Sequence, residues 1–467
     1  MKLMTSLLAL TWALAVAAET SAGSSDPVRD ALVSEALEKS PEYARARSAV
    51  DAERQREPQV GALPDPTLTL GIQNDGFEKI NIGVKETSWW QVMVTQPVPW
   101  PGKRGKLESA QRARTSVLEA QVERIRLSVT AEVERGYVDL LLVREQLALQ
   151  QKLEALWKEA EAIARTRYEV GEGTQSDLLR AQVERTRLQQ RRIALETTER
   201  TAVQTLNRLR VHPLDEAIAT DRKLADLGAP PDMTAEEAAA DAERRSPDLA
   251  QSHRAVVAAE RRVDAAKRDR YPDFALTAGI MPRGSLLPMW LASVGVTLPV
   301  FYWSKQSKAV DEAASRRQSE ASGEEATRQV VRLRAEERQA VLAALARTNQ
   351  LYREAVLVQS DAAVRSTLAQ YKVGKVTFAS VLDVLRGFVV DEASYLESLA
   401  QTQRVAIAQR EVSLEPPPAL GGGGGGVGAV PGAGAMGGRG GGATKGAAAG
   451  GAQEPTPAAG GGTTSGM

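Results

Sequence analysis

Hydrophobic positions along this chain recur with two different periods, and the changes between them divide the sequence into elements. Long stretches rich in Arg, Glu, Gln and Ala carry Leu and Val at helical spacing. Shorter stretches alternate apolar residues with small or polar ones, which is the period of a strand with two different faces. The predicted strands cover residues 66–74, 88–97, 272–281 and 289–299.

Two long predicted helices follow each pair of strands. They cover residues 104–167 and 174–208 after the first pair, and residues 304–371 and 377–414 after the second. No proline interrupts the first of them, which at 1.5 Å per residue would be roughly 95 Å long. Its apolar stripe is thin and its other faces are polar, a pattern that favours coiled-coil packing against partner helices over a broad globular core.

The two halves of the chain repeat one plan. Residues 168–174 and 371–377 both read Tyr-x-x-Gly-x-x-Thr, where the Gly permits the backbone that ends one helix and the Thr can cap the next. Other matching pairs are Ser40-Pro41 with Ser246-Pro247, Leu63-Pro-Asp65 with Tyr271-Pro-Asp273, Thr95-Gln-Pro97-Val98 with Thr297-Leu-Pro299-Val300, and Lys103 with Lys305. We therefore expect a first repeat over 19–210, a connector over 211–234 and a second repeat over 235–415.

Both ends of the chain depart from this plan. Lys2 precedes an apolar run that ends at Ala18, a pattern typical of a secretory signal peptide over residues 1–18. Residues 416–467 are rich in Gly and Ala without periodicity, which predicts a disordered tail. No stretch after residue 18 reaches the ~20 apolar residues of a membrane-spanning helix, so we expect an exported protein without one.

Composition argues against several classes of function. The 59 basic and 59 acidic residues balance, which argues against nucleic acid as a partner. The sequence has no cysteine, so it predicts neither disulfides nor a lipid attached to an N-terminal Cys. His212 and His253 are far apart and lack neighbours at metal-ligand spacing, so no metal site is predicted. With no nucleophile elbow and no phosphate loop, we expect neither an enzyme nor a bound cofactor.

Tryptophans gather in and just after the predicted strands. Trp favours membrane–water boundaries, and alternation over about ten residues is typical of strands in outer-membrane barrels. The candidates for the membrane interface are Trp89, Trp90, Trp100, Trp290 and Trp303. Because an open sheet edge would leave backbone groups unpaired in lipid, several chains must share a barrel, and three chains of four strands would supply twelve. The alternative is a soluble four-stranded sheet packed on the helices.

In order, duplication and spacing, these motifs resemble the TolC-like outer-membrane efflux protein family over residues 26–414. The strand exit Gln96-Pro-Val-Pro-Trp-Pro-Gly-Lys-Arg104 resembles its heavy-metal and cation efflux branch. The resemblance implies a mainly α fold with a small membrane β part, in which a trimeric twelve-stranded β-barrel in the outer membrane continues into a periplasmic α-helical barrel. It implies passive conduction, with a periplasmic adaptor and a proton-driven inner-membrane pump as partners.

The resemblance also assigns roles to individual residues. The turns would form the periplasmic tip that docks the adaptor, with Tyr168, Gly171, Thr174, Tyr371, Gly374 and Thr377 as its residues. Asp383 matches a position that is acidic at the narrowest point of the pore in family members, whereas Ser380 stands where a second acid is often found. Asp177 is the candidate from the first repeat. Rings of symmetry-related carboxylates would favour cations, although both aspartates also suit a helix start, where they complement the dipole.

Two other functions remain open from the sequence. The same tunnel would serve as the outer-membrane component of a type I protein secretion system, because its helix turns would look much alike. A soluble periplasmic coiled-coil scaffold would also show the long helices, but it would be extracted without detergent. Whether the substrate is a metal ion, a drug or a protein is not set by these residues.

Overall fold

The computed structural model describes residues 26–418, so the expected signal peptide and residues 419–467 of the expected tail lie outside the described residues. The chain divides into two units, Met1–Leu420 and Gly421–Met467, and everything below concerns the first. The first repeat contains α2 (Pro27–Lys39), α3 (Pro41–Gly61), β1 (Thr67–Gln73), β2 (Trp89–Val98), α4 (Lys103–Glu169) and α5 (Gln175–Leu209). After a 3₁₀ turn, η2 (Leu224–Leu227), the second contains α6 (Ala235–Arg245), α7 (Pro247–Arg268), β3 (Asp273–Arg283), β4 (Leu286–Thr297), α8 (Gln306–Leu351), η3 (Tyr352–Val356), α9 (Leu357–Lys372) and α10 (Phe378–Glu411).

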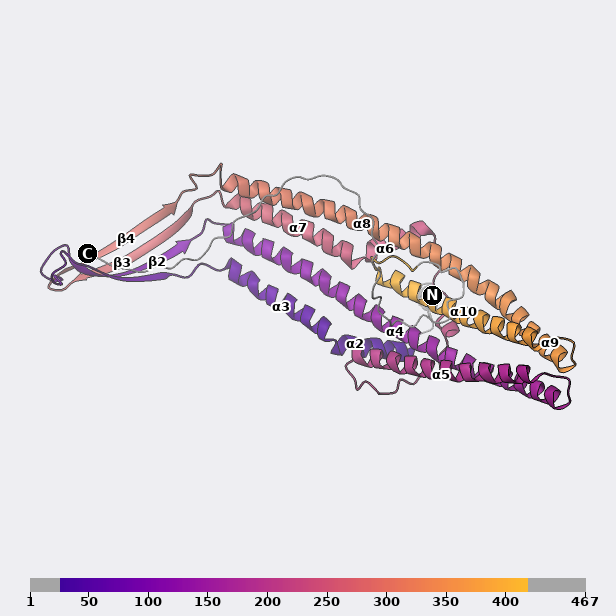
Figure 1. Cartoon of the computed structure of the whole chain (residues 1–467). Coiled ribbons are helices and arrows are strands. Elements are labelled where there is room, and N and C mark those ends of the chain that lie inside the picture. Colours follow the sequence, from indigo (N-terminus) through magenta and orange to yellow (C-terminus); the bar gives the residue numbers. More distant parts are fainter. Residues whose placement is uncertain (1–25, 419–467) are drawn as a thin grey trace, which may run out of the picture. The chain divides into compact units, whose positions relative to one another are not determined.

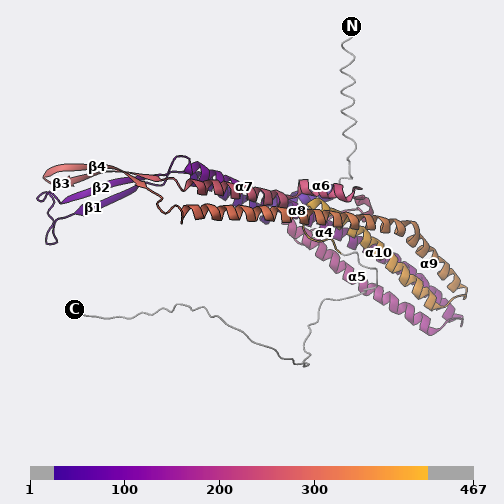
Figure 2. The same cartoon turned by 90° about the horizontal axis from the view of Figure 1, so that it is seen from above.

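The strands lie at one end of the helices, and the turns α4–α5 and α9–α10 lie at the other (Figure 1). Helices α3, α4, α7 and α8 run side by side from the sheet, and α5 and α10 return from the turns towards the middle (Figures 1 and 2). Both repeats thus follow the predicted order of a helix, two strands and a long helical hairpin. The prediction of a mainly helical fold built from two such repeats is confirmed.

Within residues 26–418, the strands form one antiparallel sheet in the order β1-β2-β3-β4. Residues directly opposite each other in such a sheet point to the same face, and Leu70, Val92, Ile280 and Trp290 follow one another across all of it. The exposed apolar side chains of this face are Leu68, Leu70, Ile72, Trp90, Val92, Val94, Leu276, Ile280, Trp290, Val294 and Val296. The opposite face carries mostly small or polar residues, among them Thr69, Gly71, Gln91, Thr95, Thr277, Gly279, Ser293 and Gly295.

The helices bury their narrow apolar stripes in two main clusters. One surrounds Tyr137 and Leu140 of α4, where α2, α5 and α10 pack against it. The other surrounds Trp157 of α4 and Phe388 of α10, and it continues to the α9–α10 turn. Each fully buried aromatic or leucine side chain contributes about 1.5–3 kcal/mol, so these clusters position the turns relative to α4.

The second long hairpin contains a local irregularity that the sequence pattern did not predict. The helix expected over 304–371 begins at Gln306 and passes through a π turn at Tyr352–Val356 before α9. A π turn adds a residue to the helical repeat and rotates the faces that follow it. Here the Tyr352 ring lies against Tyr395 of α10 at 5.8 Å, and the helix bends over this region (Figure 2).

Between residues 26 and 418, no helix has both the length and the apolar character needed to cross a membrane.

Candidate functional site

The two helix turns share one backbone conformation. Gly171 has φ +78° and Gly374 has φ +75°, the left-handed region that glycine adopts at little cost. The amide of Gly171 donates to the Tyr168 carbonyl at 3.1 Å, and that of Gly374 donates to the Tyr371 carbonyl at 3.0 Å. Each following helix is then capped by a threonine hydroxyl, Thr174 for α5 and Thr377 for α10. The six residues of the predicted tip therefore build two equivalent turns at the same end of the molecule (Figure 1).

The two tyrosines of these turns differ in their surroundings. Tyr168 is 45% exposed, whereas Tyr371 is 2% exposed and its ring lies 5.5 Å from that of Phe378. Burial raises the pKa of the Tyr371 phenol, with the Asp177 carboxylate acting in the same direction. The phenol of Tyr371 is therefore neutral at physiological pH. The second turn is anchored in the helical core, and the first presents its tyrosine to the surroundings.

Arg167 connects the two turns, although the sequence did not single it out. Its Nη1 donates to the Tyr371 carbonyl at 2.6 Å, and its Nη2 donates to the Glu172 carbonyl at 3.2 Å. Its guanidinium also lies 5.0 Å from the centre of the Tyr371 ring, a cation–π distance. The only sequence signal was a break in the repeat, since Gln370 occupies the matching position before Tyr371.

The two candidate pore aspartates lie in different settings. Asp177 is half-buried in the first turn of α5, and its amide donates to the Thr174 hydroxyl at 3.3 Å. Asp383 is exposed on α10, on the side away from buried Val381 and Leu385. One helical turn later, Arg386 donates to Glu184 of α5 at 2.6 Å. The cation nearest to Asp383 along α10, Arg386, is therefore held by Glu184 of α5.

The predicted interface tryptophans lie in four different settings. Trp90 and Trp290 are exposed on the apolar face of the sheet, opposite Ile72 and Ile280 respectively. Trp89 pairs with Gln73 and so points to the opposite face. Trp303 is 79% exposed in the turn after β4. Trp100 follows β2, and its ring stacks at 5.4 Å on Tyr271 and at 5.7 Å on Phe274.

The residues around Trp100 join the two repeats where β2 meets β3. Lys103 Nζ lies 2.9 Å from Asp273 Oδ2 and 3.0 Å from Oδ1, and the Trp100 amide donates to the same carboxylate at 2.9 Å. Within the strands, the hydroxyls of Thr95 and Thr277 lie 3.0 Å apart. The Pro-Trp-Pro-Gly-Lys motif thus forms a junction between strands and helices.

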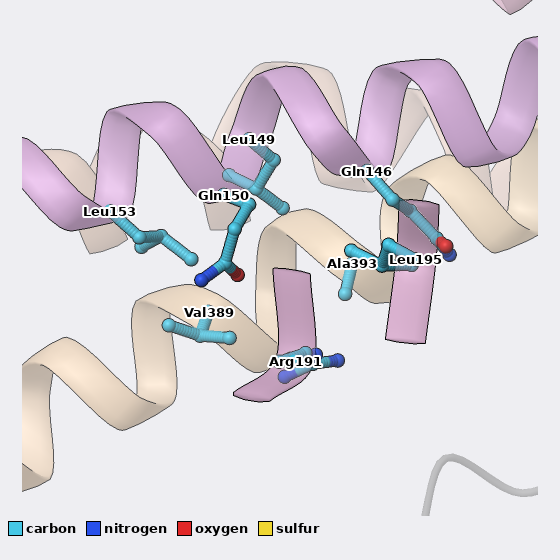
Figure 3. A pocket seen from close by; sticks show the side chains of 8 residues that line it. All are labelled: Gln146, Leu149, Gln150, Leu153, Arg191, Leu195, Val389 and Ala393. Carbon is cyan, nitrogen blue, oxygen red and sulfur yellow. The ribbon is translucent and has the colours of Figure 1, made fainter. Parts of the chain in front are cut away.

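The helical region contains a small cavity that is lined mainly by apolar and amide side chains. This cavity lies between α4, α5 and α10 and is lined by Leu149, Gln150, Leu153 and Val389 (Figure 3). The side-chain amide of Gln150 donates to the Leu188 carbonyl at 2.8 Å. In the described part of the chain, no three His, Cys, Asp or Glu residues are grouped to hold a metal ion. His212 instead lies 2.9 Å from Glu216 within the connector.

A family model described as outer membrane efflux protein matches residues 32–210 and 238–411. The chain belongs to the outer membrane efflux protein family. The two matched segments correspond to the two repeats, and together they leave out the strandless connector between α5 and α6. A search of curated protein sequences found no match.

Solved structures show the same fold for this outer membrane efflux protein. A structure of CusC superposes with a TM-score of 0.71 at 18% sequence identity, covering 83% of this chain and 92% of CusC. The open-state MtrE channel of Neisseria gonorrhoeae has a TM-score of 0.66 at 19% identity, covering 83% of this chain and 89% of MtrE. VceC from Vibrio cholerae has a TM-score of 0.65 at 16% identity, covering 82% of this chain and 95% of VceC.

Family membership confirms the main functional prediction. This outer membrane efflux protein is a channel of the outer membrane with a periplasmic helical extension, and it is not an enzyme. The family also implies a trimer within a tripartite efflux assembly. Both the helical part and the strand part of that architecture are present in the described chain.

Proposed function

We propose that three copies of this chain form the exit duct of a tripartite efflux system and conduct small solutes passively to the exterior. The observation that carries the proposal is the sheet, which has one apolar face, one small polar face and two unpaired edges within residues 26–418. In lipid such edges have to be paired, and a closed twelve-stranded barrel with the apolar face outward satisfies this requirement. Three chains of four strands supply that number.

The two turns at the far end are proposed to dock a periplasmic adaptor, which connects the duct to a proton-driven inner-membrane pump. Each turn presents an exposed valine directly before its glycine, Val170 in the first and Val373 in the second, with 65% and 66% of the side chain accessible. Tyr168 adds an exposed aromatic ring. Exposed apolar side chains on rigid turns are suitable anchors for a partner helix.

Asp383 and Asp177 are proposed to line the narrowest part of the pore near these turns. Three copies of Asp383 would form a carboxylate ring that favours cations. Arg386 lies on the same exposed side of α10 and contributes a positive charge. Ser380 stands where a second acid is often found, and its hydroxyl lies 3.3 Å from that of Thr377. We therefore expect a moderate cation preference rather than strong cation block.

Trp90, Trp290 and Trp303 are proposed to lie at the membrane interface, because their rings are exposed on or beside the apolar face. Trp89 points to the other face of the sheet, and Trp100 is stacked within the β2–β3 junction. The Pro-Trp-Pro-Gly-Lys-Arg motif that resembles the cation branch thus has a structural role at that junction. The substrate class therefore has to be determined by experiment.

The proposed function is tested by deleting the gene in its host and measuring susceptibility to heavy metals, dyes, detergents and antibiotics. Complementation with the intact gene should restore resistance. Complementation with Gly374→Pro or Thr377→Pro should fail, although trimers still reach the outer membrane, because these substitutions distort the turn that docks the adaptor. Sensitivity limited to metals would place the chain in cation efflux. Unchanged susceptibility together with loss of a secreted protein would instead show a type I secretion tunnel.

The role of Asp383 is tested separately in planar bilayers. We expect Asp383→Asn to lower the ratio of cation to anion permeability of the purified trimer while the conductance persists. The matched control is Asp391→Asn, a carboxylate on the same helix that hydrogen-bonds with Ser360 of α9. An unchanged permeability ratio in Asp383→Asn would return Asp383 to a structural role at the start of α10.

A further inference from the structure

Within residues 26–418, the sheet contains one joint between the two repeats, and a ring of chains requires a second. β2 of the first repeat pairs with β3 of the second, while the outer edges of β1 and β4 are unpaired within residues 26–418. If three copies close a barrel, as proposed above, β4 of one copy must meet β1 of the next. Because each chain is an internal repeat, the observed β2–β3 joint is a template for the joint between copies.

The observed joint has two polar links with counterparts elsewhere in the sequence. The first is the hydroxyl pair Thr95–Thr277 at 3.0 Å, and the second is the ion pair Lys103–Asp273 at 2.9 Å. In the repeat alignment, Thr95 and Lys103 correspond to Thr297 and Lys305, whereas Asp273 and Thr277 correspond to Asp65 and Thr69. Each link therefore has one counterpart near the end of β4 and another near the start of β1.

The side chains of these four counterparts have no ion pair or hydrogen bond within residues 26–418 of a single copy. Lys305 and Asp65 are exposed, and within residues 26–418 neither makes an ion pair or a side-chain hydrogen bond. The hydroxyls of Thr297 and Thr69 are likewise exposed and make no hydrogen bond in the described part of the chain. At the β2–β3 joint these linking groups are thus paired within the chain, while their counterparts at the outer edges of β1 and β4 have no partner within residues 26–418.

We propose that β4 of one copy pairs antiparallel with β1 of the next copy in the register that places Thr297 opposite Thr69. The two hydroxyls hydrogen-bond, and Lys305 forms an ion pair with Asp65 of the next copy just outside the strands. The occupant of both free edges is therefore a second copy of this chain.

The proposed register keeps both faces of the sheet continuous across the seam. It places Val296 opposite Leu70 and Val294 opposite Ile72, so apolar side chains meet on one face. Gly295 then lies opposite Gly71 on the small polar face. A slip by one residue would bring apolar residues against the polar face. A slip by two would preserve the faces but would separate both threonines and both charges by about 7 Å along the strand.

Disulfide crosslinking tests the register directly, because the chain has no cysteine of its own. A chain carrying both Thr297→Cys and Thr69→Cys is expressed, its membranes are oxidised with copper phenanthroline, and the products are separated on a denaturing gel without reductant. We expect crosslinked dimers and trimers that disappear on reduction. Each single variant reports background. Two-residue slips are monitored by pairing Thr297→Cys with Thr67→Cys or with Gly71→Cys, since a disulfide requires Cα atoms closer than about 7 Å.

Three results would overturn the proposal. Preferential crosslinking of either slipped pair would show another register. Absence of crosslinking in every pair, while the chains still form trimers and restore efflux, would show that β4 and β1 do not meet, leaving the proposed function intact. Loss of trimers and of efflux even for the cysteine-free chain would reject the exit duct and the seam together.

The charge pair is tested by exchange. Lys305→Asp and Asp65→Lys should each lower the temperature at which the trimer dissociates in detergent, and the double variant should recover most of the loss. Lys308→Asp is the matched control, because Lys308 pairs with Asp311 of its own helix at 3.1 Å. A double variant no better than the weaker single variant would contradict the ion pair.

Discussion

At the scale of single residues, both repeats end their returning helix in the same strained way. Val211 follows α5 with φ +55°, and Val412 follows α10 with φ +51°. A β-branched side chain in the left-handed region is disfavoured by about 1–2 kcal/mol. In each case an amide just beyond the valine closes the helix end, from His212 to Asn207 at 2.9 Å and from Ser413 to Ala408 at 3.1 Å. The helix ends therefore impose this conformation on residues that do not favour it.

The two valines should respond oppositely to the same substitution. Val211 is 54% exposed, so Val211→Asn should stabilise the protein by about 1 kcal/mol, since Asn tolerates this conformation. Val412 is buried against Ala239 and Val331, so Val412→Asn should destabilise it by loss of packing and burial of an amide. Thermal unfolding followed by circular dichroism in detergent measures both effects. A lower melting temperature for Val211→Asn would show that the conformation carries no strain.

At the scale of elements, the two helix turns share one backbone conformation but differ in how firmly they are packed against the helices. Tyr371 is buried and held by Arg167, whereas the matching Tyr168 is exposed. The guanidinium of Arg167 also lies against Gly374, within 3.3 Å of where a Cβ would be. Movement of the second turn away from the first therefore has to break the contacts of one arginine.

Replacing that arginine should loosen the attachment of the second turn to the first. Arg167→Gln introduces the residue that the second repeat has at the matching position, Gln370. It removes the hydrogen bond to the Tyr371 carbonyl, which contributes about 1 kcal/mol, so we expect a roughly fivefold increase in the open time of the channel. Single-channel recording in planar bilayers measures it. Arg165→Gln is the control, because Arg165 pairs with Glu161 on its own helix at 3.2 Å. Equal open times for the two variants would exclude Arg167 as a restraint.

The connector is attached to α4 through a carboxylate whose titration should be visible in stability. Glu145 accepts a hydrogen bond from the Leu224 amide at 2.5 Å, and burial raises the pKa of Glu145 above its usual 4.5. The folded protein thus holds this proton more tightly than the unfolded chain, so the stabilisation is full below pH 4.5 and is lost as pH rises through the raised pKa.

Glu145→Gln should therefore flatten the dependence of melting temperature on pH above 4.5, because Gln keeps an acceptor for Leu224 and does not titrate. Melting temperatures measured in detergent between pH 4.5 and 7 provide the comparison. Glu320→Gln, an exposed site on α8, should leave the slope of the intact protein unchanged. A wild-type slope in Glu145→Gln would assign the titration to another group.

The elements themselves were largely predictable from the sequence. Strand alternation, the Gly and Thr of the turns and the Ser-Pro helix starts depend on local chemistry, and the ends of the strands lie within three residues of the expected ranges. The π turn at Tyr352–Val356 was not predictable, because no proline or glycine marks it. Arg167 was missed because its partner, the Tyr371 carbonyl, lies 204 residues away in sequence. The positions of Trp89 and Trp90 on opposite faces follow from period-two alternation, which places only Trp90 on the apolar face.

At the scale of the whole molecule, the sheet separates the environments that a channel has to separate. Most of its exposed apolar side chains lie on one face, and adjacent positions on the same strands supply threonine, serine, glycine and glutamine to the other, together with Trp89, Met93 and Leu291. In the proposed barrel, the pairing register therefore decides which residues meet lipid and which meet the aqueous lumen. Neither face has helices packed on it (Figures 1 and 2), so the soluble alternative, a sheet buried on the helices, does not describe this chain.

Adjacent residues of β4 provide a direct test of the two faces. Val294→Arg places a charge on the apolar face, where an arginine near the bilayer midplane costs about 2–4 kcal/mol, so we expect less trimer in the outer membrane. Ser293→Arg points to the other face and should leave assembly intact while lowering conductance. Immunoblots of outer-membrane fractions and bilayer recordings measure the two effects. The opposite pattern would reverse the assignment of lipid and lumen.

The internal repeat has a consequence for how such a duct assembles. A chain with a single repeat would carry one strand pair, and six separate molecules would have to meet before the ring closed. Here the β2–β3 joint forms inside every chain, so its formation does not depend on the level of expression. Half of the joints in the proposed ring therefore form independently of protein concentration, and only three joints between molecules remain. Carrying two repeats in one chain therefore makes ring closure less sensitive to dilution.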